Sequence, residues 1–354
     1  MTADQLTYEA TELLKELISI ESLSTQEDKT AEAIEKFFSK HGVNTTRKGN
    51  NVWAKNAAFN PNKQTILLNS HHDTVKPNAG WTLDPFKPTV IDGKLHGLGS
   101  NDAGGALVSL IATFLHFNAQ QNLKYNFILA ATAEEENSGK GGVVSILEEL
   151  GKVDFSIVGE PTEMKMAVAE KGLMVIDCTA KGKAGHAARD VGENAITNAI
   201  KDIEWFHSYK FPKVSESLGP VKMSVTIINS GSQHNVIPDT CKFTVDIRSI
   251  DAYTNEEIVG IIRQHVKCEV VPRSTRLNAS GIDTNHLIVT TAKKLGIETF
   301  GSATSSDMPL LKVPAVKMGP GRSERSHTAD EFIFLKEIGE GISLYIKLLE
   351  QIVI

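Results

Sequence analysis

Residues 64–75 read QTILLNSHHDTV, in which a short apolar run at 66–68 leads directly to His71, His72 and Asp73. An apolar run of this length, bounded by polar residues, is typical of a buried strand. The imidazole and carboxylate groups would then lie just beyond the C-terminal end of that strand. In open parallel sheets this edge is where ligands bind. The stretch therefore predicts a strand that delivers metal-ligating or catalytic side chains to one edge of a sheet.

The same arrangement recurs further along the chain. Apolar runs at 127–130, 157–158 and 315–316 are followed by residues of the same kinds, namely Glu134, Glu135, Glu136, Glu160 and His327. Between the first two strands, apolar residues at helical spacing over 107–115 predict a helix. Strands that alternate with amphipathic helices predict an α/β fold whose mostly parallel sheet is covered by helices on both faces.

The middle of the chain has a different pattern. Residues 243–247 alternate apolar and polar side chains, which predicts a sheet with one buried and one solvated face. A helical pattern over 195–203 precedes this strand. We therefore predict an inserted α+β domain over residues 173–279 and a catalytic, metal-binding domain formed by residues 1–172 and 280–354.

The composition is that of a globular protein. Of 354 residues, 41% are hydrophobic and 23% are charged, which argues against a disordered chain or a coiled coil. The formal net charge of -6 predicts no general attraction for nucleic acid or an anionic membrane. No apolar run approaches the ~18 residues that span a bilayer, and the acidic N-terminus MTADQLTYEATELL is unlike a signal peptide. We expect a cytoplasmic protein without nucleic-acid or membrane partners.

The ligand types at the predicted sheet edge indicate which metals would bind. Imidazole and carboxylate without thiolate suit Zn²⁺, Co²⁺ or Mn²⁺, and the 3 cysteines lack the close pairing of a thiolate zinc site. Two histidines and three carboxylates exceed the three protein ligands of one catalytic zinc ion. They suit two ions about 3.5–4 Å apart that share one carboxylate and a water. A remaining carboxylate could then act as general base.

Each of these residues also has a structural interpretation. A single histidine is more often a surface or core residue, and three successive glutamates are more often a solvated helix face. Asp102, in the glycine-rich loop GLGSNDAGG, could be the N-cap of the following helix, and residues 159–161 could form a plain turn. Their common position after predicted strands or in a glycine-rich loop favours a shared site.

Seven motifs stand out in order along the chain: SHHDTV, GLGSNDAGG, TAEEENSG, VGEPT, GKAGHAA, HNVIP with VDIR, and SHTADEF. They resemble the motifs of the M20 metallopeptidases, the family of acetylornithine deacetylase, succinyl-diaminopimelate desuccinylase and aminoacylase-1. The resemblance covers nearly the whole chain and is greatest to the acetylornithine deacetylase branch. It implies a zinc-exopeptidase-like catalytic domain with an inserted dimerisation, or lid, domain, and hence a homodimer.

The resemblance implies two metal ions per chain. One would be held by His71, Asp102 and Glu160. The other would be held by Asp102, Glu136 and His327, so that Asp102 bridges the pair. Zn²⁺ is the first candidate, and Co²⁺ or Mn²⁺ would also suit these ligands.

The remaining roles at this edge also follow from the resemblance. Asp73 would orient His71, and Glu135 would be the general base. The family commonly has a cis peptide after its bridging aspartate, which here would join Asp102 and Ala103. The other phase of the acidic run, with Glu134 as base and Glu135 as ligand, is compatible with the spacing.

Three residues of the predicted insertion match further family positions. His186 would reach into the partner subunit's site and stabilise an oxyanion. Asn235 and Arg248 would bind the substrate's carboxylate, which a guanidinium can grip with two hydrogen bonds. Taken alone, His186 could be a turn residue and Arg248 a solvent-facing strand residue.

The implied activity is metal-dependent hydrolysis of the amide bond of an N-acyl amino acid. The substrate would be N-acetyl-L-ornithine or a related acyl-ornithine or acyl-citrulline, in arginine biosynthesis. Succinyl-diaminopimelate desuccinylase and an M20 dipeptidase are alternatives, and a non-catalytic binding relative would be expected to lose the base or a ligand. Departures from the family pattern at Leu98, Gly104 and Asp190 match no ligand and leave the subfamily open.

Overall fold

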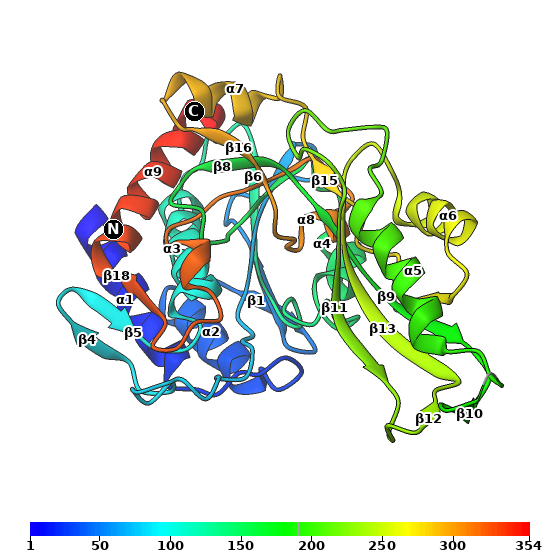
Figure 1. The fold of residues 1–354 in the computed structure, drawn as a ribbon. Coiled ribbons are helices and arrows are strands. Elements are labelled where there is room, and N and C mark those ends of the chain that lie inside the picture. The colour runs from blue at the N-terminus through cyan, green and yellow to red at the C-terminus, as the bar shows by residue number, and fades with distance from the viewer. Residues whose placement is uncertain (190) are drawn as a thin grey trace. The chain divides into compact units, whose positions relative to one another are not determined.

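The computed structural model describes residues 1–189 and 191–354, so that Asp190 lies outside the described residues. The chain divides into two compact units (Figure 1). The first comprises Met1–Val168, Ile282–Phe300 and Ser306–Ile354, and the second comprises Ala169–Gly281 and Gly301–Ser305. The second unit includes all of the predicted insertion, residues 173–279.

The first unit is built on a mixed sheet with the strand order β1-β2-β6-β3-β7-β17-β8-β15, in which the last residues of β8 and β16 and the short β15 (Ser280–Gly281) are assigned to the second unit. Its strands are β1 (Thr45–Lys48), β2 (Asn51–Lys55), β3 (Thr65–His71), β6 (Asn126–Thr132), β7 (Phe155–Val158), β8 (Met166–Glu170), β16 (Thr299–Ser302), which pairs with β8, and β17 (Ala315–Lys317). The central strands β6, β3, β7 and β17 are parallel to one another. The flanking β1, β2 and β8 pair antiparallel. The predicted α/β class is confirmed, and its parallel part is the centre of this sheet.

The central strands are buried along their whole length. Every residue of β3 and β6 is buried, because helices and loops cover both faces of the sheet. Helix α3 packs on β3 and β6 and contacts α1 and α9, and these elements contribute to one hydrophobic core. The helices of this unit are α1 (Ala3–Ile18), α2 (Asp28–Lys40), α3 (Gly105–Asn118), α4 (Leu147–Leu150), α7 (Leu287–Lys294), α8 (Met308–Leu311) and α9 (Leu335–Val353).

Short elements carry the loops around the sheet. A small antiparallel sheet joins β18 (Phe332–Phe334), β5 (Lys94–His96) and β4 (Thr89–Ile91). Single turns of helix lie at η1 (Ser100–Gly104), η2 (Val143–Ile146) and η3 (Ser323–Arg325). Within the described residues, no helix has both the length and the apolar character needed to cross a membrane.

The second unit is an antiparallel sheet packed against helices, in the order β11-β13-β9-β14. Its elements are β9 (Gly172–Lys181), β10 (Gly185–His186), α5 (Ala195–Ser208), β11 (Lys222–Ser230), β12 (Val236–Ile237), β13 (Thr240–Ser249), α6 (Asn255–His265), β14 (Glu269–Pro272) and β15 (Ser280–Gly281). Alternate residues of β9 are buried, as expected of a sheet with one covered face. All 3 cysteines lie buried in this unit's own core and none forms a disulfide.

Candidate active site

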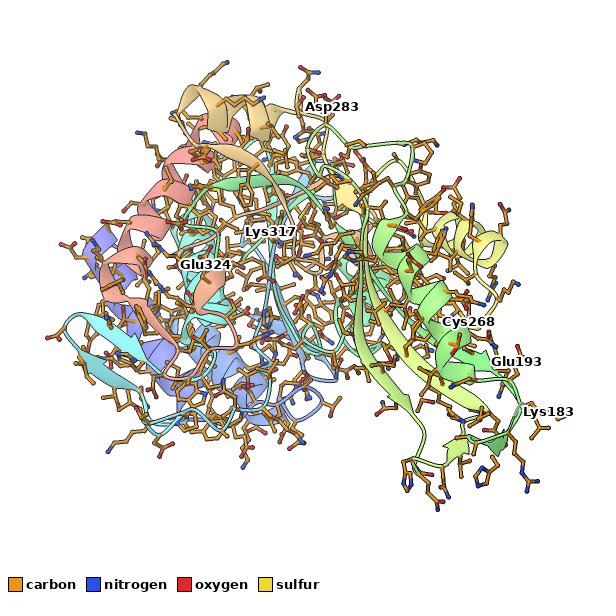
Figure 2. The ribbon with its side chains drawn as sticks, viewed as in Figure 1. Lys183, Glu193, Cys268, Asp283, Lys317 and Glu324 are labelled. Carbon is orange, nitrogen blue, oxygen red and sulfur yellow. The ribbon has the colours of Figure 1, made fainter. Side chains whose placement is uncertain are left out.

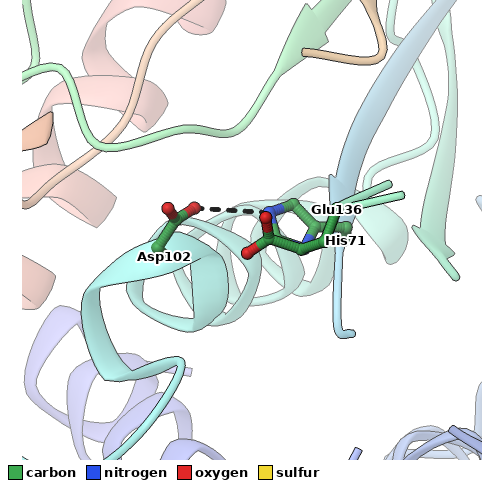
Figure 3. A group of neighbouring side chains, drawn as sticks. All are labelled: His71, Asp102 and Glu136. Carbon is green, nitrogen blue, oxygen red and sulfur yellow. Dashed lines mark ion pairs between the residues drawn. The ribbon is translucent and has the colours of Figure 1, made fainter. Parts of the chain in front are cut away.

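The site lies at the C-terminal ends of the central strands. His71 is the last residue of β3, Glu135 and Glu136 follow β6, and Glu160 follows β7. Asp102 lies in η1, the turn that leads into α3. Figure 3 shows Asp102 and Glu136 beside the ring of His71. These side chains meet because parallel strands end at the same edge of a sheet, as the sequence predicts.

His71 lies at the centre of a group of carboxylates. Its Nε2 atom lies 3.4 Å from Oδ1 of Asp102, 3.8 Å from Oε1 of Glu160 and 3.9 Å from Oε2 of Glu135. Ligand atoms around one tetrahedral ion, at about 2.0–2.2 Å from it, are roughly 3.3–3.6 Å apart. The group is therefore compact enough to share a cation.

His327 completes the site from the segment after β17. Its Nε2 atom lies 3.0 Å from Oε2 of Glu136 and 3.6 Å from Oδ2 of Asp102. The two oxygens of Asp102 thus face different histidines, Oδ1 toward His71 and Oδ2 toward His327. A carboxylate in this position can bridge two ions.

The protonation of His71 leaves one nitrogen for a metal. Nδ1 donates a hydrogen bond of 3.0 Å to the backbone carbonyl of Asp73, whose carboxylate is also near, at 3.4 Å. In the neutral ring, which is the form that binds a metal ion, Nδ1 therefore carries the proton and the lone pair lies on Nε2. That atom is buried and has no hydrogen-bond partner. A buried, unsatisfied lone pair that faces carboxylates fits a divalent cation.

The raised pKa values in the site indicate more negative than positive charge among its side chains. Burial disfavours the charged form of His71, but the nearby carboxylates of Asp102 and Asp73 outweigh it and raise its pKa well above the usual value. Burial raises the pKa of Glu160 to about 8, with the charge of Asp102 adding to the effect. The hydrogen bond to Glu136 raises the pKa of His327 to about 9. A bound cation would stabilise all of these carboxylates in their charged form.

Within the part of the chain that the structure describes, two groups could hold a metal ion. They are His71 with Asp102 and Glu136, and His71 with Glu135 and Glu160, with ligand atoms within 4.8 Å of one another. The donor set of imidazole and carboxylate oxygens fits the predicted divalent ions. The division of ligands between two ions stays a prediction.

Asp73 also holds the acidic segment in place. Its carboxylate accepts hydrogen bonds from the backbone N–H groups of Glu135 at 3.0 Å and Glu136 at 3.2 Å, and from the hydroxyl of Ser24 at 2.7 Å. The peptide bond that joins Asp102 to Ala103 is cis, as the family resemblance implies.

The geometry favours one of the two phases of the acidic run. The carboxylate of Glu134 accepts the backbone N–H of Gly141 at 3.0 Å, whereas Glu135 and Glu136 lie beside the two histidines. Burial, with the charge of Glu160 adding to it, raises the pKa of Glu135 well above its usual value. A buried carboxylate with a raised pKa is suited to take and return a proton.

Sequence reasoning missed several buried carboxylates that support the site. Asp307 accepts hydrogen bonds of 3.0 Å from both Asn69 on β3 and Thr132 on β6. Glu27 accepts the backbone N–H of Glu134 at 3.3 Å. The signal was indirect: the polar Asn69, which directly follows the apolar run 66–68, needs a partner if it is buried, but the sequence does not say which residue supplies it.

The other predicted site residues belong to the second unit. His186 lies on β10, and its Nδ1 accepts the backbone N–H of Ala188 at 3.1 Å, which leaves the proton on Nε2. The backbone carbonyl of Asn235 accepts the backbone N–H of Ala187 at 3.0 Å. Arg248 pairs with Asp246 through two hydrogen bonds of 2.9 and 3.1 Å. The roles of His186, Asn235 and Arg248 stay predictions.

Imidazole and carboxylate groups that converge at the C-terminal edge of a parallel sheet, close enough to hold a divalent cation, are the arrangement of a metal-dependent hydrolase. The model of Peptidase family M20/M25/M40 matches residues 67–351 of this chain. The chain belongs to this family.

The names of similar proteins specify different substrates. The chain is 23% identical to succinyl-diaminopimelate desuccinylase 2 of Ruegeria sp. (strain TM1040), over 96% of this chain and 94% of that one. It is 28% identical to acetylornithine deacetylase of Proteus mirabilis (strain HI4320), over 76% and 74% of the two chains. It is 29% identical to the [LysW]-lysine/[LysW]-ornithine hydrolase of Sulfurisphaera tokodaii, over 96% and 95%.

Solved structures share the fold. An M20 family metallo-carboxypeptidase from Sulfolobus solfataricus superposes with a TM-score of 0.77 at 17% identity, over 96% of this chain and 98% of that one. A dinuclear metal binding peptidase of the M20 family from Bacillus subtilis superposes with a TM-score of 0.74 at 17% identity, over 98% of both chains.

Proposed function

We propose that this protein hydrolyses the amide bond of an N-acyl amino acid at a two-metal centre. The observation that carries the proposal is the position of Asp102, whose two oxygens face His71 and His327. His71, Asp102 and Glu160 would hold one ion, and Asp102, Glu136 and His327 the other, with Zn²⁺ the first candidate and Co²⁺ or Mn²⁺ also suited. When bound, such ions lower the pKa of a coordinated water and polarise an amide carbonyl.

The side chains of this chain would move the protons. Glu135 would take a proton from the attacking water and return it to the nitrogen of the leaving amine. Burial is the first cause of its raised pKa, and a carboxylate with a raised pKa is a stronger base for this exchange. Asp73 would keep His71 and Glu135 in place through its carbonyl and its carboxylate.

Two residues of the second unit would bind the substrate. Arg248 and Asn235 would grip its carboxylate, and Arg248 would have to exchange Asp246 for the substrate when it does so. His186 of the partner subunit would stabilise the oxyanion, in a homodimer. The proton on its Nε2, left there by the hydrogen bond to Nδ1, supports a donor role.

We propose N-acetyl-L-ornithine, or a related acyl-ornithine or acyl-citrulline, as the substrate, in arginine biosynthesis in the cytoplasm. Two of the three relatives described above carry ornithine in their names. The third is named a succinyl-diaminopimelate desuccinylase, which keeps that activity as the second candidate. A dipeptide is the third candidate, since the structural relatives include peptidases.

The test is a substrate panel with purified, zinc-loaded protein. It should contain acetylornithine, acetylcitrulline, succinylornithine, succinyl-diaminopimelate and a dipeptide, with release of amine as the readout. We expect the highest kcat/KM with an acyl-ornithine or acyl-citrulline, loss of activity after dialysis against a chelator, and recovery with Zn²⁺. Preference for succinyl-diaminopimelate or the dipeptide would overturn the substrate assignment. No amine release from any compound, from protein that holds no metal, would indicate a non-catalytic binding relative.

A further inference from the structure

Glu331 is a buried carboxylate that the reaction outlined above does not use. It directly precedes β18 and its side chain is almost fully buried, with 2% of the residue exposed. Burying a carboxylate is unfavourable unless hydrogen bonds compensate for the lost water. Here the partners are all backbone N–H groups of the loop that supplies Asp102.

The carboxylate of Glu331 accepts three hydrogen bonds from this loop. Oε1 accepts the N–H of Asn101 at 2.8 Å and the N–H of Asp102 at 2.9 Å, and Oε2 accepts the N–H of Gly99 at 3.2 Å. The turn is interrupted at Asp102, which has non-helical backbone angles, with φ of -118° and ψ of 98°. Glu331 is the acceptor for three backbone N–H groups in this interrupted turn, which would otherwise need other partners.

A second contact joins the same two segments. The side-chain amide of Asn101 donates to the carbonyl of Arg322 at 3.0 Å and accepts the N–H of Arg322 at 2.9 Å. The stretch from Arg322 to Glu331 contains His327. The segment that supplies His327 thus also fixes the loop that supplies Asp102.

We propose that Glu331 is a positioning residue that aims Asp102 between the two histidines and thereby sets the affinity of the metal centre. The proposal rests on the proposed two-metal function. Both oxygens are needed, because Oε1 accepts the N–H groups of Asn101 and Asp102 and Oε2 accepts that of Gly99. In Glu331→Gln, one oxygen is replaced by an NH₂ group that would face a backbone N–H, so at least one hydrogen bond is lost.

The test compares Glu331→Gln and Glu331→Asp with the wild type and with a matched control, Glu324→Gln. Glu324 is an exposed glutamate in η3 of the same segment (Figure 2). Metal affinity is measured by competition with a chromophoric chelator, and the visible absorption of the Co²⁺-loaded protein reports the coordination geometry. We expect both Glu331 variants to bind the more weakly held ion about 10–100-fold less tightly and to show an altered Co²⁺ spectrum. Glu324→Gln should match the wild type in both.

Circular dichroism and thermal unfolding of the apoproteins separate positioning from folding. Wild-type affinity and an unchanged Co²⁺ spectrum in Glu331→Gln would overturn the proposal. So would failure of both Glu331 variants to fold, since Glu331 would then be a folding residue. If the wild type hydrolyses no amide but the Glu331 variants still lose metal affinity, the proposed function fails and this inference stands. If the wild type binds no metal, both fail.

Discussion

The carboxylate of Asp73 accepts the backbone N–H of Glu135 at 3.0 Å, and the carbonyl of Asp73 accepts Nδ1–H of His71 at 3.0 Å. One residue thus fixes both the predicted base and a predicted metal ligand. In Asp73→Asn, the side chain keeps one acceptor oxygen for the donors of Glu135, Glu136 and Ser24. We expect kcat to fall by about 10–100-fold, as for other outer partners of metal ligands.

Steady-state kinetics of Asp73→Asn, beside Ser24→Ala, checks this expectation. Ser24→Ala removes a single hydrogen bond from the same carboxylate and leaves the backbone contacts intact, so its effect should be clearly smaller. Equal kcat values for Asp73→Asn and the wild type would show that the carboxylate does not position the base.

Glu135→Gln tests the general base. The amide cannot take a proton from water, so we expect turnover to fall by about 10²–10⁴-fold while the metal content stays at the wild-type level. Metal analysis and amine release give the two measurements. Glu134→Gln is the matched control, because Glu134 bonds to the loop at Gly141. Loss of turnover in Glu134→Gln together with an active Glu135→Gln would assign the base to the other phase of the acidic run.

The sequence predicts the residues of the site better than the buried carboxylates that hydrogen-bond to the segments around them. The apolar runs that become β3, β6, β7 and β17 are recognisable because strands buried on both faces are continuously apolar. The polar residues that follow these strands lie together because parallel strands end at the same edge of the sheet. Partners such as Asp307 and Glu331 are not predictable in this way, because single carboxylates in irregular segments show no periodicity. Their partners come from distant segments, as Asn69 does for Asp307.

The edge strands escaped prediction for a related reason. Strand β1 reads TTRK and has no buried residue, so no apolar pattern marks it. Its antiparallel pairing with β2 follows from a tight connection, not from hydrophobic character. Apolar periodicity in a sequence reflects which side chains are buried. A strand at the edge of the sheet buries few side chains, so it shows little periodicity.

His72, beside the ligand His71, should make stability depend on pH. Its Nε2 faces the carbonyl of Asn50 at 2.9 Å and its Nδ1 lies 2.9 Å from the hydroxyl of Thr30, so the buried ring is satisfied when neutral. Burial lowers its pKa from 6.5 to about 4. Between these values the unfolded chain binds a proton that the folded protein does not, so the free energy of unfolding falls as pH falls.

The size of this effect is on the order of 3 kcal/mol across the interval from pH 6.5 to 4. Urea unfolding of the apoprotein at several pH values, for the wild type and His72→Gln, measures it. The wild type should lose more stability than His72→Gln on acidification, and His234→Gln, which changes an exposed histidine, should follow the wild type. Parallel curves for the wild type and His72→Gln would mean that His72 does not stay neutral in the fold.

Mixed dimers test whether His186 acts on the partner subunit. We expect His186→Ala and Glu135→Gln each to be nearly inactive alone. In a dimer that contains one chain of each variant, one site would combine an intact Glu135 with the intact His186 of the other chain. Random exchange of subunits in a two-fold dimer should therefore restore about a quarter of the wild-type activity. If His186 served its own chain, every site in the mixture would lack one of the two groups, and no activity would return. Light scattering that finds a fully active monomer would also remove this role, whereas recovery that appears only after subunit exchange would establish it.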